Sequence, residues 1–245
     1  MDQRTVLARH PVFSALPPEA LLRVASVSEF KRLRRGDLLW RRGDVANEFN
    51  LVVQGLVAIF VPSSAGRSMM VGLFEPGQSV GDAAVIEGAA RTCAAYAFTT
   101  PQTVMTLPRA EVLTALTQHG AAAMALGRYL GKMNDLLTRR LALSTATADA
   151  RLARILLDLA ERFGDELEDA SVLIPLRVTR AQLAALVGAT VETTIRTLSR
   201  WTRDGHIVSD EHGIVLKNPA QLAAIAGDDE SAVAVDPAAA TGFDV

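Results

Sequence analysis

Short apolar runs separated by glycines extend from Glu29 to Pro108, and this pattern constrains the fold more than any other feature of the chain. Leu51-Val52-Val53 and Val57–Val61 are examples of these runs, and glycines at positions 36, 43, 55, 66, 77 and 81 separate them. Apolar runs of this length, bounded by turn residues, are typical of strands. The stretch Pro62–Arg67 has the composition of a hairpin connection. We therefore predict an antiparallel β-roll or barrel in this region.

After Pro108 the apolar residues follow the period of a helix. Their positions are separated by steps of four or three, at Leu126, Leu130, Met133, Leu137, Leu141 and Ser144. So narrow a stripe is typical of a coiled-coil seam. It predicts a long helix from about residue 120 to 146, within a dimerisation region at about 110–146, that pairs two copies of the chain. The alternative is a helix that packs on its own domain. The polar residues beside the stripe favour the pairing.

We place a domain boundary at residues 146 and 147, so that a sensor domain covers 1–146. The segment Thr145–Asp149 interrupts the leucines there and is expected to act as a hinge. Helices are predicted at residues 150–163, 179–187 and 191–202, with an acidic solvated loop at 165–169 and a hairpin around Gly213. This order over residues 147–227 is that of a winged helix-turn-helix. Residues 228–245, rich in Ala and Asp, are expected to be disordered.

Length and composition exclude several classes of protein. A chain of 245 residues can form two cores. It has no apolar run near the roughly 20 residues that span a bilayer, and its amino terminus lacks the apolar stretch of a secretory signal. We therefore expect a cytoplasmic protein with no membrane partner. The single cysteine, Cys93, excludes an internal disulfide and an intrachain cysteine-ligated iron–sulfur cluster.

The histidines argue against an enzyme on a similar roll. A metal-dependent cupin needs histidines clustered with a carboxylate inside the roll. The four histidines, at positions 10, 119, 206 and 212, form no such cluster in the sequence. We expect no catalytic residues and no bound metal. Heme bound through Cys93 stays open as an alternative, although a lone cysteine is more often a small core residue.

Basic residues concentrate in the second predicted domain, although the chain carries a net charge of −2. From Arg177 to His206 the arginines outnumber the acidic residues by three. A helix in the major groove reads base edges with its first turns. Glu192 and Arg196 lie one turn apart there and are suited to cytosine N4 and to guanine O6 and N7. Further DNA contacts are predicted at Arg180, Thr193, Arg200 and Arg203. The alternative is an ordinary surface pair of Glu192 and Arg196.

The segments Thr179–Gly188 and Val191–Arg196 resemble the helix-turn-helix of the Crp/Fnr family of regulators. The resemblance extends over residues 11–227. It implies an α+β fold: an antiparallel β-roll of the double-stranded jelly-roll type, a long dimerisation helix and a winged helix-turn-helix. It also implies a homodimer that binds a two-fold-symmetric site in double-stranded DNA, with RNA polymerase as a further partner. The resemblance further implies that Glu192 and Arg196 are the residues that contact the bases. Val191 matches the Fnr branch, whereas Ile195 departs from both branches.

A second group of residues has the chemistry of a phosphate site. Gly81, Asp82 and Ala83 are followed by Arg91 and Thr92. A glycine turn exposes backbone N–H groups, an arginine neutralises phosphate, a hydroxyl donates and a carboxylate can accept from ribose. The alternative is purely structural: Gly81 forms a turn, Asp82 caps a helix, and Arg91 and Thr92 begin an exposed strand. The resemblance implies that Arg91 and Thr92 hold a cyclic phosphate and that Asp82 meets the ribose 2′-hydroxyl, although Asp stands where the family normally has Glu.

The base of such a nucleotide would meet the long helix. Where a family member has hydroxyl residues, this chain has Leu136 and Leu137, so the polar candidates are Asn134, Asp135 and Thr138. Because both Thr92 and Asp135 can bond guanine, cGMP rivals cAMP as the effector. We expect cAMP or cGMP, with no prosthetic group. A different effector, no effector, or a cyclic-nucleotide module without DNA reading are the alternatives.

Overall fold

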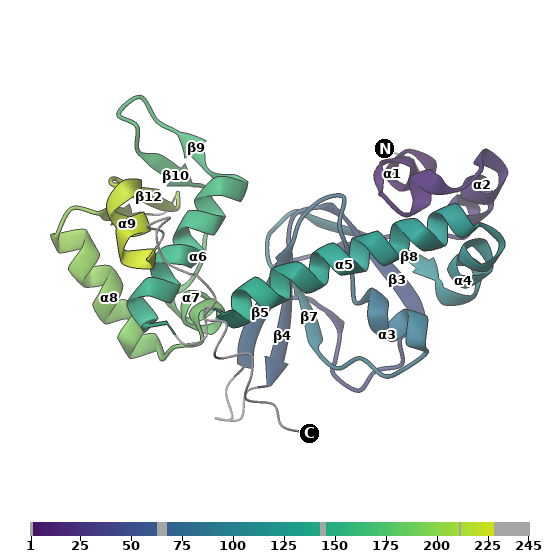
Figure 1. Ribbon diagram of the computed structural model, residues 1–245, viewed down its shortest axis with the longest axis horizontal. Helices are drawn as coiled ribbons and strands as arrows, with labels where there is room; N and C mark the ends of the chain where they lie inside the picture. Colours follow the sequence, from purple (N-terminus) through teal and green to yellow (C-terminus); the bar gives the residue numbers. More distant parts are fainter. Residues whose placement is uncertain (1, 63–67, 143–145, 211, 228–245) are drawn as a thin grey trace, which may run out of the picture. The chain divides into compact units, whose positions relative to one another are not determined.

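A computed structural model describes residues 2–62, 68–142, 146–210 and 212–227, and of residues 136 and 139–142 it describes the backbone alone. The chain forms two compact units, residues 1–144 and 145–245 (Figure 1). The predicted hairpin at 62–67 lies mostly outside the described residues. The predicted disordered segment, 228–245, lies wholly outside them.

The N-terminal unit begins with three short helices and continues as strands. The helices are α1 (Gln3–Arg9), η1 (Phe13–Ala15) and α2 (Pro18–Ser26), and Pro18 suits the first helical position because its missing N–H has no partner there anyway. The strands are β1 (Glu29–Leu33), β2 (Leu38–Trp40), β3 (Glu48–Gln54), β4 (Val57–Pro62), β5 (Ser68–Phe74), β6 (Ser79–Val80), β7 (Ala94–Ala97) and β8 (Gln102–Pro108). A short helix, α3 (Asp82–Glu87), lies between β6 and β7.

These strands form two four-stranded antiparallel sheets, which confirms the predicted roll. One sheet has the order β1-β8-β3-β6 and the other β2-β7-β4-β5. A cluster of buried residues from both sheets packs between them: Trp40, Val52, Val57, Ile59, Val80, Ala95 and Val104. Burial of such side chains contributes about 1.5–3 kcal/mol each. The roll is therefore a filled core, and its inner residues shape the site described below.

The dimerisation region predicted at about residues 110–146 contains two helices, and the second begins at residue 120, where the long helix was predicted to start. α4 (Arg109–Gln118) ends at His119, whose backbone is extended, and α5 (Gly120–Ala142) follows. Figure 1 shows α5 lying along the roll. Its residues Leu126, Leu130 and Met133 pack against the large buried cluster that the first sheet shares with the helices.

Within the subunit these three residues are only partly buried, so the predicted seam between two copies stays a prediction. A four-three spacing identifies the apolar face of a helix but not the surface that covers it, and here part of that face packs within the subunit. Leu137 is 53% exposed. The side chain of Leu141, and Ser144 as a whole, lie outside what is described.

The C-terminal unit is a winged helix-turn-helix, as predicted. Its helices are α6 (Ala148–Phe163), α7 (Arg180–Val187), α8 (Val191–Arg203) and α9 (Pro219–Ala226). Its strands are β9 (Asp165–Glu166), β10 (Val172–Ile174), β11 (Ile207–Ser209) and β12 (Ile214–Leu216), in one antiparallel sheet of order β11-β12-β10-β9. Among the described residues, no helix is long and apolar enough to cross a membrane.

Two local predictions in this unit need correction. Thr147 accepts a hydrogen bond from the backbone N–H of Ala150 and so caps α6, which places Asp149 in the first turn of a helix and not in a hinge. The acidic stretch after α6 is not wholly a loop, because Asp165 and Glu166 pair with β10. Acidic side chains favour loops, but here backbone pairing with β10 stabilises the extended conformation of these two residues.

Candidate functional sites

Arg91 is buried at the centre of the first site. Its Nη1 donates to the carbonyl oxygen of Gly81 and its Nη2 to that of Glu48, both at 2.7 Å. The guanidinium carbon lies 4.2 Å from the centroid of the Trp40 ring. The side chain is only 4% exposed, and burial lowers the pKa of the guanidinium despite the acidic groups around it. Arg91 is thus a cation held by backbone carbonyls.

Gly81 allows this close approach. Its φ of 75° is in the left-handed region that favours glycine, and it precedes the first residue of α3. A Cβ at this position would collide with Nη1 of Arg91 and would lie 3.0 Å from Cζ2 of Trp40. Any larger residue at position 81 would therefore displace the guanidinium.

Asp82 lies beside this cation. It is 5% exposed, and its Oδ2 accepts a short hydrogen bond from the Ser79 hydroxyl. Its Oδ1 is buried without a partner in the described structure, as is Nε of Arg91. Burial raises the pKa of the Asp82 carboxyl to about 6, against the opposing effects of Ser79 and Arg91. The site therefore has a buried carboxylate oxygen and a buried guanidinium N–H, and neither has a hydrogen-bond partner among the described residues.

The raised pKa predicts that Asp82→Asn stabilises the protein at neutral pH. The pKa of this carboxyl rises from 3.8 to about 6 on folding, so between these two pH values it is mostly protonated in the folded state and mostly ionised in the unfolded state. Above pH 6 its ionisation lowers the free energy of unfolding by up to about 3 kcal/mol. This cost fades as the pH falls from 6 to 4. We expect Asp82→Asn to unfold at higher urea concentration than wild type at pH 7.5, and the gap to close near pH 4.

The same urea titrations contain their own control. A loss of shape or packing at residue 82 would shift the midpoint equally at every pH. An Asn variant that is less stable than wild type by a constant amount from pH 4 to 7.5 would show that ionisation of Asp82 does not matter.

Ser79 links this site to α5. Its backbone N–H donates to the Tyr129 hydroxyl at 2.9 Å, and that hydroxyl donates to the Ser79 carbonyl oxygen at 3.1 Å. The Tyr129 hydroxyl can make both bonds because it is donor and acceptor at once. A shift of Asp82 or Ser79 on ligand binding would thus be transmitted directly to α5.

The structure brings together only part of the predicted ligand set. Gly81, Asp82 and Arg91 meet, whereas the side chains of Ala83 and Thr92 are exposed beside them. Asn134, Asp135 and Thr138 do not join this group. All three are exposed, and the helical period places Asn134 and Thr138 on the side of α5 opposite Tyr129. The Thr138 hydroxyl instead donates to the carbonyl oxygen of Asn134 at 3.0 Å.

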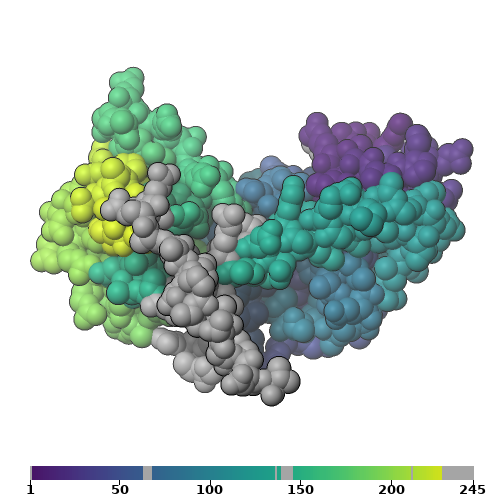
Figure 2. Space-filling view, in the orientation of Figure 1, coloured from purple at the N-terminus to yellow at the C-terminus, as the bar shows by residue number. Residues whose placement is uncertain are grey.

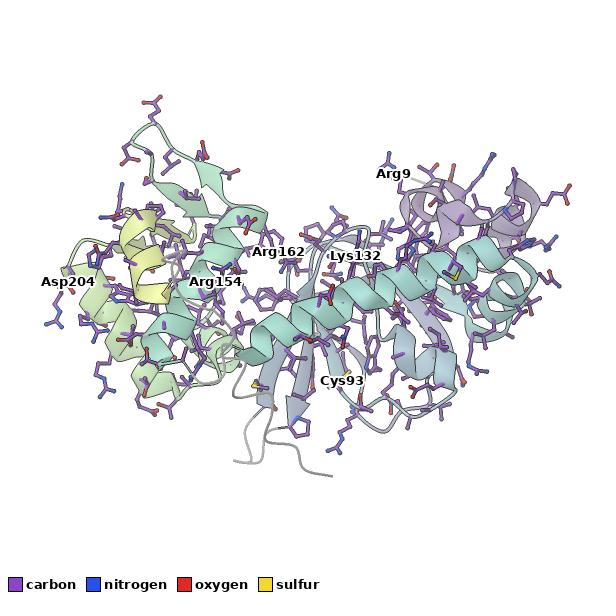
Figure 3. All side chains as sticks on the ribbon, in the orientation of Figure 1. Arg9, Cys93, Lys132, Arg154, Arg162 and Asp204 are labelled. Atoms are coloured by element: carbon purple, nitrogen blue, oxygen red, sulfur yellow. The ribbon has the colours of Figure 1, made fainter. Side chains whose placement is uncertain are left out.

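The second site is the exposed face of α8. The buried side of this helix carries Thr194, Thr197, Leu198 and Trp201. Glu192, Arg196 and Arg203 are exposed, as predicted for residues that reach DNA. Figure 3 labels Asp204, the residue that caps the C-terminal end of α8. Arg180 begins α7 and is half-buried.

Two of the predicted DNA contacts have partners within the unit. Arg200 forms a short ion pair with Asp149 of α6, and the Thr197 hydroxyl donates to the same carboxylate at 2.7 Å. Burial opposes ionisation of Asp149, but these bonds and the charges of Arg200 and Arg196 outweigh it and lower its pKa. Thr193 is half-buried, and its hydroxyl accepts from the capping residue Thr190 at 3.0 Å. Arg200 and Thr193 therefore also hold α8 in position.

Comparison with known proteins assigns both units. The model of the cyclic nucleotide-binding domain matches residues 30–119, and that of the Crp-like helix-turn-helix domain matches residues 150–225. The CRP-like cAMP-activated global transcriptional regulator of Mycobacterium tuberculosis is 24% identical over 224 residues, which are 91% of this chain and 98% of that protein. The nitrogen fixation regulation protein FixK of Bradyrhizobium diazoefficiens is 27% identical over 226 residues, 84% of this chain and 87% of that protein.

A solved structure agrees with these relatives. A CRP/FNR-family transcriptional regulator from Thermus thermophilus is 28% identical and superposes with a TM-score of 0.62, over 81% of this chain and 98% of that one. The chain belongs to the Crp/Fnr family. As a member of the Crp/Fnr family it is a ligand-responsive, DNA-binding transcription regulator, and its relatives are regulators, not enzymes.

Sequence reasoning missed three contributors to the first site of this Crp/Fnr regulator. They are Trp40, the Glu48 carbonyl and the Tyr129 hydroxyl. A backbone carbonyl has no sequence signal at all. The tyrosine was the one hydroxyl on the face of α5 that packs on the roll, and that face could be recognised only after the covering sheet was known. Trp40 has no sequence signal that connects it with Arg91.

Proposed function

We propose that the effector of this regulator is cAMP or cGMP, bound at Arg91. The observation that carries the proposal is a guanidinium that is 4% exposed, forms no ion pair with any described carboxylate and keeps one N–H without a partner. A buried cation without a hydrogen-bonded anionic partner is costly, and a phosphate is well suited to it because bidentate bonds to arginine are strong. The cyclic nucleotide-binding domain match and the relative named as cAMP-activated support this choice.

The remaining groups fit the rest of such a ligand. Oδ1 of Asp82 is buried and has no partner, so it is available to accept from the ribose 2′-hydroxyl. Backbone groups near Gly81 and Ala83, with the Thr92 hydroxyl, complete the contacts to phosphate. Asn134, Asp135 and Thr138 face away from their own roll, so their role toward a base depends on a second copy of the chain.

We propose that this second copy pairs along the exposed side of α5. Figure 2 shows α5, in teal, as a ridge on the visible surface of its unit. Met124 is 64% exposed on this helix, and a Cβ at Gly127 or Gly131 would meet no atom within 4 Å. Glycine inside a helix costs about 1 kcal/mol relative to alanine, and nothing in the subunit requires it at either position. Close approach of a second helix would explain both glycines.

Gly131→Leu should therefore weaken the dimer. A leucine there would fill the space that the partner helix needs, and we expect the dissociation constant of the dimer to rise at least tenfold, measured by sedimentation equilibrium. Lys132→Leu is the matched control, because it adds the same side chain on another side of α5 (Figure 3). Equal effects of the two variants would contradict pairing on the glycine side.

The function is tested by ligand titration followed by DNA binding. Purified protein is titrated with cAMP and with cGMP in a calorimeter, and its affinity for a two-fold-symmetric DNA site is measured in each state. We expect at least one nucleotide to bind and to change DNA affinity by about 5- to 150-fold, because effector and DNA affinities are linked reciprocally. If neither nucleotide binds, the effector is of another kind. If one binds without any effect on DNA affinity, the regulatory link is refuted.

The cellular setting follows from this function. We propose a cytoplasmic location, where double-stranded DNA is accessible to a bacterial regulator, and RNA polymerase as the protein partner. Its bacterial relatives are transcriptional regulators, some of them named as activators, which supports both assignments.

A further inference from the structure

Trp40 covers the guanidinium of Arg91. It ends β2, is 6% exposed and belongs to the cluster between the two sheets. Its ring lies over one face of the guanidinium at 4.2 Å, a cation–π geometry that is strengthened by burial. The same ring approaches Gly81, since two of its carbons would lie 3.0 and 3.1 Å from a Cβ there. Trp40 thus contacts both the cation and the glycine turn.

A phosphate cannot reach Arg91 in this arrangement. The ring covers one face, and two of the guanidinium nitrogens already donate to the carbonyl oxygens of Gly81 and Glu48. With 4% of the side chain exposed, an anion the size of a cyclic phosphate has no route to it. Binding therefore requires Arg91, Trp40 or both to move.

Two buried hydrogen-bond donors lack partners among the described residues in this closed arrangement, in which Trp40 covers Arg91. The indole Nε1 of Trp40 and Nε of Arg91 are both buried donors without a partner in the described structure. Each unsatisfied buried donor carries a desolvation cost, and so does a cation without an anionic partner. These costs oppose the cation–π contact and the two carbonyl bonds, so that an open arrangement is within reach of a ligand's binding energy.

We propose that Trp40 is the gate of the Arg91 site and sets its affinity for cyclic nucleotides. In the closed state the tryptophan stacks on Arg91. On binding, the phosphate replaces the Trp40 contact, and the freed Nε of Arg91 gains an acceptor. The ligand must supply the free energy that separates the stacked pair, so that the protein responds only to ligands with enough contacts elsewhere in the site. This inference rests on the proposed cyclic-nucleotide effector.

The test compares the affinities of wild type, Trp40→Leu and Trp40→Phe for cAMP and for cGMP by calorimetry. Leucine removes the stack on Arg91 but keeps an apolar side chain, and we expect it to bind nucleotide roughly tenfold more tightly. Phenylalanine keeps a smaller aromatic face and should fall between the two. Circular dichroism would detect a Trp40→Leu protein that fails to fold. In that case the Trp40→Phe variant still tests the proposal. Val57→Ala is the matched control, because it empties space in the same cluster without removing the stack.

The outcomes separate the gate from the effector. Tighter binding by both Trp40 variants, with Val57→Ala unchanged, supports the gate. Binding by the variants but not by wild type supports the gate and refutes cAMP and cGMP as the effectors of the natural protein. Binding by wild type with equal or weaker binding by the variants overturns the gate and leaves the effector intact. Absence of binding in all four proteins overturns both.

Discussion

Arg91→Leu is expected to abolish measurable binding of cAMP and cGMP, with a loss of at least 100-fold in affinity. The substitution removes the one buried cation of the site, and a phosphate without it would be buried unpaired. The expected loss corresponds to about 3 kcal/mol or more, in the range for hydrogen bonds to a charged partner that is left unpaired. Calorimetric titration of the variant measures it directly.

Arg91 also joins two backbone segments, so its loss must be separated from unfolding. Its bonds to the carbonyl oxygens of Gly81 and Glu48 hold the α3 turn against β3. Arg91→Lys keeps the charge but not the planar fork of donors, so it should bind nucleotide more weakly than wild type and more tightly than Arg91→Leu. Unchanged affinity in a folded Arg91→Leu protein would show that the nucleotide binds elsewhere or not at all.

The fold was largely predictable because its signals are local. Glycine-bounded apolar runs indicate strands, and the order of helix, short turn, helix and hairpin indicates a winged helix-turn-helix, without any knowledge of distant contacts. Packing between distant segments was not predictable in this way. Leu126 and Met133 have the spacing of a pairing seam, and only the folded subunit shows that part of this face packs within it.

The candidate site was predictable where a side chain carries the chemistry and not where packing does. Gly81, Asp82 and Arg91 were grouped because a turn, a carboxylate and a guanidinium have the chemistry of a phosphate site and because the resemblance supports that role, and the structure does place them together. The burial of Arg91 under Trp40 could not be found, because residues 51 positions apart meet only through long-range backbone pairing, that of β2 with β7 and that of Arg91 with Gly43 and Asp44. The ion pair of Arg200 with Asp149 was missed for the same reason.

Arg196→Ala is expected to cost about 1–3 kcal/mol in specific DNA binding and to relax discrimination at a single base pair of each half-site. The side chain is exposed in the first turns of α8, one turn from Glu192, where a recognition helix meets base edges. Mobility-shift or fluorescence titrations against a set of single base-pair variants of the preferred site measure both effects. The expected pattern is a large loss on the preferred sequence and little loss on sites already altered at the guanine.

Arg203→Ala provides the contrast that makes this result interpretable. It removes the same charge from the last turn of the same helix, where a side chain is placed to contact phosphate and not bases. It should weaken binding to all sequences by similar factors and reduce the slope of log affinity against log salt by about one. Both variants lose one positive charge from the same exposed face. The sequence-independent loss of DNA affinity that follows from this charge is therefore common to both, and the difference between them reports contacts to bases. A uniform loss for Arg196→Ala across every site, indistinguishable from that of Arg203→Ala, would mean that Arg196 contacts phosphate and that the bases are read by other residues.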